Sequence, residues 1–231
     1  MKYIPETDSF EEISLEKASL PFTLAVDDEG KIWFTATGTG KIGFINPQNN
    51  EITEFSRDPP LQGPEALLFD KDGNLWIAEH TGVAITKFNP ILETFEQITV
   101  PDPEALPFGM AFDRYDNVWF AQHVTDNIAA YDPHNNNLIE VPIPTAGSFT
   151  QFMTSDDKEN VWFVQQQGNK LATVKITEIP ITAAQIQSSQ KVEIQYTELA
   201  SPLIAMGIVA TSLFFVKSVK DKRRLNDLIN S

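Results

Sequence analysis

The sequence predicts an all-β fold, a β-propeller with four recognisable four-stranded blades. Three observations lead to this fold class. The four tryptophans of the 231-residue chain are spaced by 43 residues each time, other columns of residues repeat with the same period, and each repeat divides into short strands. A period of about 40 to 50 residues is typical of propeller blades or helical arrays. Short strands bounded by turn residues exclude the helical arrays.

The repeated columns surround each tryptophan. An aspartate lies six residues before it, an isoleucine or leucine follows nine residues later, and a proline follows fourteen residues later in three repeats. The aspartate and tryptophan columns are Asp27 and Trp33, Asp70 and Trp76, Asp113 and Trp119, and Asp156 and Trp162. We therefore expect residues 1–198 to form the blades, with the tryptophans packed between them.

The third repeat shows the strands of one blade, which we name a to d from the centre outwards. FGMAFD, VWFAQH, IAAYDP and LIEVPI are separated by short turns, and strands a and b are continuously apolar, as expected when blades pack on both faces. The outer strand of the fourth blade is expected within residues 190–197. Residues 9–15 match the end of a repeat and are expected to form an additional outer strand.

The additional strand would belong to a blade that the sequence does not contain. We therefore expect the sequence to be the C-terminal part of a longer propeller. A four-bladed ring is one alternative, because rings usually have four to eight blades. Assembly between chains is the other.

Composition excludes several functions. The formal charge of −15 opposes nucleic acid as a partner and favours cations or basic partners. The absence of cysteine excludes disulfides, thiolate zinc sites and cysteine nucleophiles. No nucleophile elbow, phosphate loop or dinucleotide fingerprint is present.

The C-terminal region predicts a membrane anchor. Eighteen uncharged residues lie between Glu198 and Lys217, and a helix of this length spans about 27 Å. We expect a transmembrane helix over 199–217 and a basic cytoplasmic tail over 218–231, with a buried core helix as the alternative. Cationic flanks stay inside, which places the propeller outside the cell membrane. The first residues lack an export signal, so either the N-terminus is incomplete or the protein is tail-anchored with a cytoplasmic domain.

Candidate functional residues lie four positions after each tryptophan, where the b–c loops open on one face of a propeller. They are Thr37, His80, His123 and Gln166, with Glu79 and Gln122 beside the two histidines. Histidine is a suitable general base because its pKa of about 6.5 lies near neutrality. The alternative is that these residues cap strand ends and pair with neighbouring polar groups.

A shared metal site is less favoured by this pattern. Adjacent sheets pack about 10 Å apart, so His80 and His123 should not easily meet one ion with Glu79. The Asp70–Asn74 segment lacks the later ligands of a calcium loop and is expected to be a tight turn. His134 lies on a c–d turn and is expected to be solvated.

These columns resemble a known family. The pattern P-x-x-x-x-x-D-x-x-G-x-x-W-[FI], followed by KIGFINP and ITEF, is similar to the blade repeat of streptogramin (virginiamycin B) lyases over residues 9–176. The tail resembles the anchor of membrane-bound archaeal members. The resemblance implies a seven-bladed propeller in which a magnesium ion held by glutamates and a histidine base open a cyclic depsipeptide by elimination at its ester bond.

The lyase motif itself is incomplete. In that family a glutamate three residues after a tryptophan is followed two residues later by the histidine. The first position is occupied here by Ala36, Glu79, Gln122 and Gln165, and the second by Gly38, Thr81, Val124 and Gln167. Only Glu79 matches, as a candidate magnesium ligand.

The sequence thus favours a membrane-anchored module that binds a small polar ligand or a membrane-associated protein at its mouth. The alternative is an enzyme, either a metal-dependent lyase or a lactone hydrolase, with His80 or His123 as base.

Overall fold

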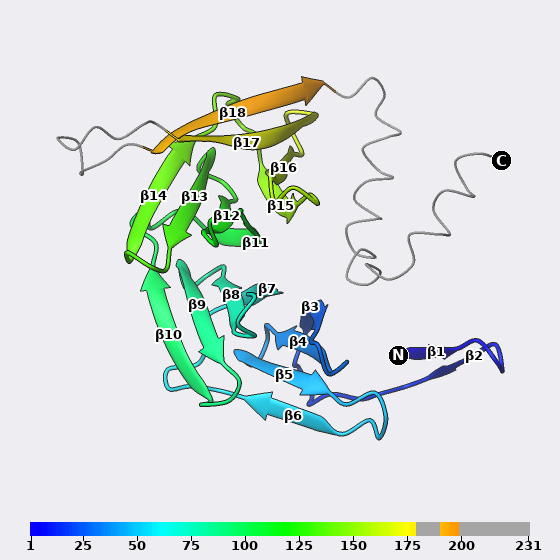
Figure 1. The fold of residues 1–231 in the computed structure, drawn as a ribbon. Helices are drawn as coiled ribbons and strands as arrows, with labels where there is room; N and C mark the ends of the chain where they lie inside the picture. The colour runs from blue at the N-terminus through cyan, green and yellow to red at the C-terminus, as the bar shows by residue number, and fades with distance from the viewer. Residues whose placement is uncertain (179–189, 199–231) are drawn as a thin grey trace, which may run out of the picture.

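A computed structural model of the chain describes residues 1–178 and 190–198. Most of these residues form four antiparallel sheets of four strands, hydrogen-bonded in sequence order within each sheet. In Figure 1 the sheets stand side by side in an arc, with the first strand of each nearest the centre and the fourth outermost. This is the blade arrangement of a β-propeller, as the repeat predicts.

The strands follow the expected repeat. Blade 1 contains β3 (Pro21–Val26), β4 (Ile32–Ala36), β5 (Lys41–Ile45) and β6 (Ile52–Phe55). Blade 2 contains β7 (Pro64–Phe69), β8 (Leu75–Glu79), β9 (Ala84–Asn89) and β10 (Thr94–Thr99). Blade 3 contains β11 (Pro107–Phe112), β12 (Val118–Gln122), β13 (Asn127–Asp132) and β14 (Asn137–Pro142). Blade 4 contains β15 (Thr150–Ser155), β16 (Val161–Gln165), β17 (Lys170–Glu178) and β18 (Gln190–Glu198).

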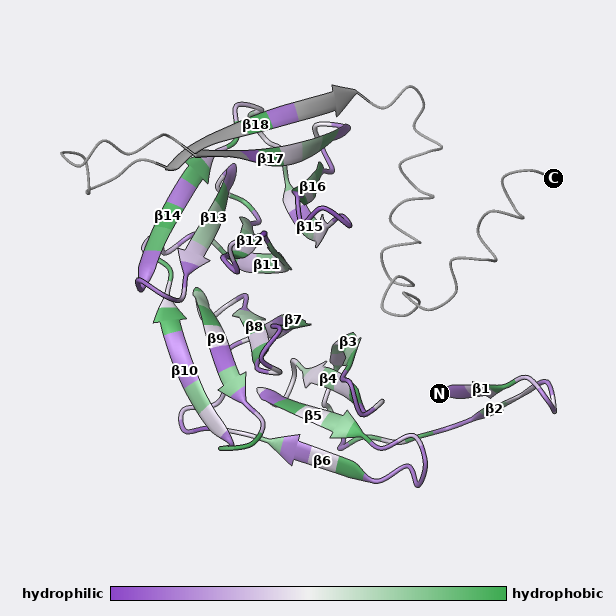
Figure 2. Cartoon of the chain, viewed as in Figure 1, coloured by the Kyte–Doolittle hydropathy of each residue, from purple (hydrophilic) through white to green (hydrophobic). Residues whose placement is uncertain are grey.

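Burial decreases from the inner to the outer strands. Every residue of β8 and β12 is buried, as expected for strands covered on both faces. The outer strands β10 and β14 include exposed residues, and in Figure 2 they are banded purple and green. The core therefore lies between the blades and not in one central cluster.

Three apolar clusters join the blades. We call the face of a blade that packs on the next blade its trailing face, and the face that packs on the previous blade its leading face. The trailing face carries the tryptophan, and Trp33, Trp76 and Trp119 are only 1–2% exposed. At each junction this tryptophan belongs to a cluster with apolar side chains of the following blade. The tryptophans thus pack between blades, as predicted.

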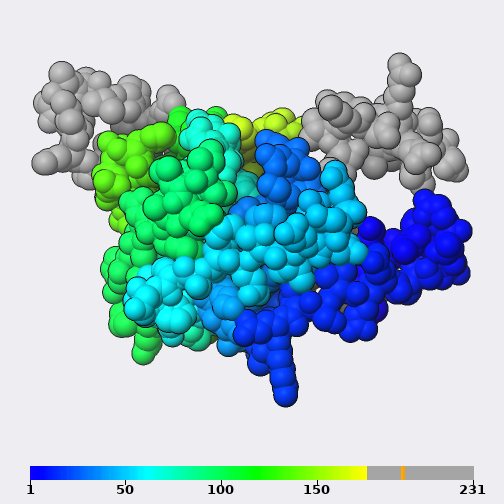
Figure 3. Space-filling view, turned by 90° about the horizontal axis from the view of Figure 1, so that it is seen from below, coloured from blue at the N-terminus to red at the C-terminus, as the bar shows by residue number. Residues whose placement is uncertain are grey.

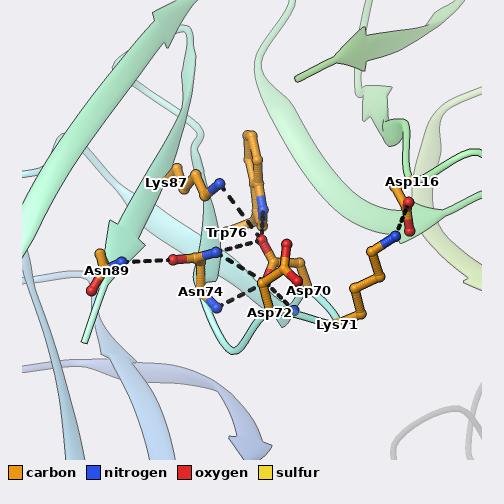
Figure 4. Close-up of polar contacts among 8 residues, drawn as sticks. All are labelled: Asp70, Lys71, Asp72, Asn74, Trp76, Lys87, Asn89 and Asp116. Carbon is orange, nitrogen blue, oxygen red and sulfur yellow. Dashed lines mark hydrogen bonds and ion pairs between the residues drawn. The ribbon is translucent and has the colours of Figure 1, made fainter. Parts of the chain in front are cut away.

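The a–b turn of every blade is built around the repeated aspartate. In blade 2, the Asp70 carboxylate accepts hydrogen bonds from the backbone N–H groups of Asp72 and Asn74 and from Trp76 Nε1, at 2.8–3.1 Å (Figure 4). The other three aspartates accept the same tryptophan bond at 2.8–3.0 Å. The turn donors occupy these carboxylates, which confirms the tight turn expected at Asp70–Asn74.

Left-handed backbone conformations recur at fixed places in the blades, with φ between 45° and 85°. They occur at Leu20, Gly30, Gly40 and Asn50; Gly63, Gly73, Val83 and Glu93; Leu106, Asp116, Asp126 and Asn136; and Phe149, Glu159 and Asn169. Within each blade they are ten residues apart, one at each change of strand. The turns of all blades thus share one geometry, whichever residue occupies them.

The N-terminal segment differs from the expected single strand over 9–15. It forms a two-stranded hairpin, in which β1 (Lys2–Ile4) pairs with β2 (Ser9–Glu11). Asp8, in its turn, is left-handed like the residues of the c–d turns, so the hairpin resembles an outer strand pair. It contacts blade 1 through a hydrogen bond from Asn50 Nδ2 to Glu11 Oε1. Figure 3 shows these residues, in blue, projecting from the side of the body.

The structure contains the outer strand expected within residues 190–197, as β18. The transmembrane helix expected over 199–217 and the basic tail over 218–231 lie outside the described residues. Among the residues that are described, no helix has the length and apolarity needed to cross a membrane.

Candidate functional site

The b–c loops and the segments that precede strand a meet on one face, which we call the mouth. In each blade a backbone N–H just after strand b donates to the carbonyl of the residue before strand a. The pairs are Thr37 and Leu20, His80 and Gly63, His123 and Leu106, and Gln166 and Phe149, at 2.8–3.4 Å. These hydrogen bonds place the four expected candidates at equivalent points of the mouth.

His80 links blade 2 to blade 3. Its Nδ1 lies 3.2 Å from the carbonyl oxygen of Pro107, and Thr37 Oγ1 makes the same contact one blade earlier, 2.7 Å from the carbonyl oxygen of Pro64. Because a carbonyl only accepts, Nδ1 of His80 donates, and the neutral ring has its lone pair on Nε2. This contact matches the capping alternative and also orients a potential base.

His123 has no such contact. Both of its ring nitrogens are buried, and neither has a hydrogen-bond partner in the described part of the chain. Burial lowers the pKa of His123, and the nearby charge of His80 lowers it further. At neutral pH the ring is therefore an uncharged group whose polar atoms have no partner among the described residues.

Aromatic side chains surround the two histidines. The ring of His123 lies 4.3 Å from that of Phe149 and 5.3 Å from that of His80, between centroids, and Phe108 contacts both histidines at 5.4–5.5 Å. Phe108 also makes edge contacts with Phe22 of blade 1 and Phe152 of blade 4, at 5.8 and 5.7 Å. Side chains from all four blades thus meet in one histidine and aromatic cluster.

The short distance between the two histidine rings corrects an expectation. A spacing of about 10 Å applies to sheets packed face to face, whereas blades converge towards the centre of the arc. His80 and His123 therefore approach each other closely at the mouth. Nevertheless, the described residues contain no group of three or more potential ligands placed to hold a metal ion.

Glu65 is a member of the cluster that the sequence analysis missed. Its Oε2 lies 3.8 Å from Nδ1 of His80. Burial raises the pKa of Glu65, and the charge of His80 opposes this shift. Glu65 occupies the second position of strand a, where the other blades carry Phe22, Phe108 and Gln151. This variation between repeats, beside columns that stay constant, is the signal that could have identified the position.

Glu79 does not line the mouth, contrary to expectation. It is fully buried, and Arg57 Nη2 donates to both carboxylate oxygens at 2.9 and 3.1 Å. Further hydrogen bonds come from the Gln62 backbone N–H and from the side chains of Thr86 and Gln97. The carboxylate is thus occupied by protein donors, and its surroundings do not fit a magnesium ion.

The remaining candidates divide between the interior and the surface. Gln122 is fully buried and donates to Glu140 Oε1, so it does not face the mouth either. Gln166 is exposed at the mouth, and Thr37 is half-buried there. His134 is exposed on its turn, as predicted.

The fold and the mouth define a class: a β-propeller with a histidine and aromatic cluster where its blades converge. The model of the Virginiamycin B lyase family matches residues 8–197, and the chain belongs to this family. No curated protein sequence matches the chain.

Solved structures of lyases share the fold. Selenomethionine-substituted virginiamycin B lyase from Staphylococcus aureus is 22% identical, with a TM-score of 0.66 over 80% of this chain and 57% of that one. A streptogramin B lyase is 24% identical, with a TM-score of 0.69 over 83% and 59%. A catalytically inactive variant of the S. aureus enzyme, with quinupristin, is 22% identical, with a TM-score of 0.69 over 83% and 60%. The matched part of this chain thus spans 57–60% of their length.

Proposed function

We propose that this protein is a ligand-binding propeller whose binding site is the histidine and aromatic cluster at the mouth. The observation that carries the proposal is the state of His123, whose two buried ring nitrogens have no partner among the described residues. Leaving a buried polar group unpaired costs about 1–3 kcal/mol. A ligand that forms a hydrogen bond with this ring would remove the cost.

The surroundings indicate the chemistry of the ligand. Phe22 and Phe152 remain 55% and 42% exposed beside the buried Phe108, and exposed aromatic groups at a mouth favour a ligand with an aromatic or apolar part. His80, His123 and Glu65 add polar contacts that would fix its orientation. We therefore propose a small organic ligand with an apolar part and a polar group that bonds to His123.

The proposed location rests on the sequence of residues 199–231. A helix over 199–217 would anchor the propeller at the outer face of the cell membrane, and a membrane-associated protein would be an alternative occupant of the mouth. Recovery of the full chain with membranes, resistant to carbonate washing, would support the anchor; recovery in the soluble fraction would contradict it.

Catalysis is the second candidate function, and the orientation of His80 favours it. The hydrogen bond from Nδ1 to Pro107 fixes the lone pair of the neutral ring on Nε2, which is the arrangement of a general base. Such a base could serve ester elimination, as in a lyase, or attack of water on a lactone. Glu79 would take no part, because Arg57 occupies its carboxylate.

Nuclear magnetic resonance of the histidine rings tests binding directly. The chain has three histidines, and exposed His134 lies on a c–d turn, so it serves as an internal control. We expect quinupristin to shift the ring signals of His80 and His123 and to leave those of His134 unchanged. Phe108→Ala should weaken the effect, whereas the control Ile91→Ala, on an exposed turn, should not. Equal shifts at all three rings, or none, would contradict the proposal.

The fate of the ligand separates binding from catalysis. After incubation with the full chain, quinupristin that is recovered intact supports a binding module. A linear isomer of unchanged mass indicates elimination, and a product heavier by one water indicates hydrolysis. Dihydrocoumarin, an aromatic lactone, provides the corresponding test for lactone hydrolysis, with His80→Phe as the variant that should abolish either reaction.

A further inference from the structure

The polar atoms of the histidine and aromatic cluster are mainly hydrogen-bond acceptors. An ionised Glu65 carboxylate only accepts. His80 donates its Nδ1 proton to Pro107, so the neutral ring offers a lone pair at Nε2. The neutral ring of His123 has one acceptor and one donor, and neither has a partner among the described residues. A ligand that pairs with these atoms must therefore bring mainly hydrogen-bond donors.

The three polar side chains belong to the two middle blades of the arc. Glu65 lies on β7, His80 follows β8, and His123 follows β12. Blade 2 packs on blades 1 and 3, and blade 3 packs on blades 2 and 4, through the three apolar clusters. The arrangement of these side chains is therefore set by junctions that the structure contains in full.

Glu65 carries a charge that its surroundings do not neutralise by hydrogen bonding. In the part of the chain that the structure describes, its carboxylate accepts no hydrogen bond, and its ion-pair contact is Nδ1 of His80 at 3.8 Å, beyond hydrogen-bond distance. Glu79, on the same blade, is fully buried and receives donors from Arg57 and Gln62, whereas the Glu65 side chain is 18% exposed. Burial raises the pKa of Glu65, and the charge of His80 opposes the shift. A bound cation would favour the ionised carboxylate.

An ammonium group meets these requirements. It combines a positive charge with three N–H donors and no acceptor, so it can pair with Glu65 and also donate to a histidine lone pair. Aromatic rings attract cations, and the ring of Phe108 lies 5.4–5.5 Å from those of both histidines. A metal ion fits less well, because the described residues contain no group of three potential ligands placed to hold one.

Resting on the proposed function, we propose that the small organic ligand of the mouth is an amine, bound as its ammonium ion. The ammonium group pairs with Glu65 and donates to the lone pair of His123, and the apolar part of the ligand contacts Phe108. Glu65 is then the residue that determines specificity. A neutral ligand of the same shape leaves the carboxylate without a partner, and an anionic ligand is repelled by it.

Three aromatic probes that differ in charge test the proposal in the full chain. Phenethylamine is the cation, phenethyl alcohol is its neutral counterpart, and hydrocinnamate is the anion. At about pH 8 an ordinary histidine is neutral and an alkyl ammonium is charged. We expect phenethylamine to shift the ring signals of His80 and His123, but not those of His134, and to bind at least about tenfold more tightly than the alcohol. Hydrocinnamate should shift none of the three.

A matched pair of variants assigns the preference to one carboxylate. Glu65→Gln keeps the size of the side chain and removes its charge, so it should bring the affinities for phenethylamine and phenethyl alcohol to about the same value. Glu96→Gln removes the same charge from the same blade, at an exposed position of β10, and should keep the preference for the amine.

The failure of this proposal is distinguishable from the failure of the binding site itself. If the alcohol binds as tightly as the amine, or if the preference persists in Glu65→Gln, the amine is the wrong ligand class although the site binds ligands. The same conclusion follows if quinupristin shifts the rings of His80 and His123 and none of the three probes does. If quinupristin and the probes all leave both rings unchanged, the proposed function fails as well.

Discussion

The junction between blades 1 and 2 and the junction between blades 2 and 3 solve the same packing problem with opposite placement of charge. In the first, buried Glu79 pairs with Arg57 and also accepts from Gln97. In the second, equivalent positions carry buried Gln122, Val100 in place of the arginine, and Glu140 in place of Gln97. Carboxylate and amide have thus exchanged places.

The difference shows what a buried carboxylate requires in this fold. Where the chain supplies a cation, the carboxylate occupies the buried end of strand b. Where Val100 replaces that cation, the carboxylate lies on the outer strand, at exposed Glu140, and a neutral amide takes the interior position. A charge without a partner is expensive to bury. The loss of the arginine and the loss of the buried glutamate therefore belong together. Glu79 is thus a structural residue, although its position resembles that of a metal ligand.

The largest expected effect comes from breaking this pairing. Arg57→Val leaves the buried Glu79 carboxylate without its cation, and we expect it to lower the free energy of unfolding by about 3–5 kcal/mol. Adding Glu79→Gln and Gln97→Glu rebuilds the arrangement of the second junction. The triple variant should recover to within about 1 kcal/mol of the unaltered protein. Urea unfolding followed by tryptophan fluorescence measures both; a triple variant as unstable as Arg57→Val would refute the comparison.

A smaller effect is expected from pH, because the protonation of His123 changes the free energy of unfolding. Burial and His80 lower the pKa of His123, so the unfolded chain binds this proton more tightly than the folded chain. The contribution of the neutral His123 ring to the free energy of unfolding is therefore complete above the pKa of about 6.5 in the unfolded chain. It is lost as the pH falls below that value.

The measurement is urea unfolding between about pH 5 and about pH 8, a range that brackets the ordinary histidine pKa, for the unaltered chain and His123→Phe. The advantage of the variant should grow as the pH falls. Parallel curves for the two proteins would show that His123 is not the source of the pH dependence.

The smallest effect is expected at the opposite end of the second junction, where Lys71 pairs with Asp116 between the a–b turns of blades 2 and 3 (Figure 4). Both side chains are solvent-exposed, at 63% and 37%, and exposed pairs contribute about 0–1 kcal/mol. Asp116→Asn should therefore change the free energy of unfolding by less than about 1 kcal/mol. A loss comparable to that of Arg57→Val would show that exposure does not decide the difference.

The fold follows from the sequence to an unusual degree because a repeat supplies many independent signals. The Asp27 column identifies the a–b turn and the Trp33 column identifies the junction between blades. The two are linked, because the indole N–H of Trp33 donates to the Asp27 carboxylate. The hairpin β1–β2 was not predicted, because Lys2–Ile4 carries too few residues to show a pattern. The outer strand of blade 4, β18, also begins later than the 43-residue repeat would place it after β14.

The site was only partly predictable, since the repeat fixes strands and not the direction of each side chain. The repeat puts His80 and His123 directly after strand b, and in the structure their backbone N–H groups donate to the carbonyls of the residues before strand a. Glu79 precedes His80 by one residue, and successive side chains of a strand point to opposite faces, so neighbours in sequence became separated in space. Phe108 and Glu65 come from strand a, and only the convergence of the blades brings them beside the histidines.

The ten-residue spacing of the left-handed positions sets how the gene of such a protein can change length. Asn50 and Gly63 are thirteen residues apart, as are Glu93 and Leu106, and Asn136 and Phe149. A repeat of 43 residues can therefore be duplicated or lost as a whole without disturbing its neighbours. One codon inserted within a strand would instead turn every later side chain of that strand to the opposite face. Selection would then admit changes in whole blades and reject most shorter ones.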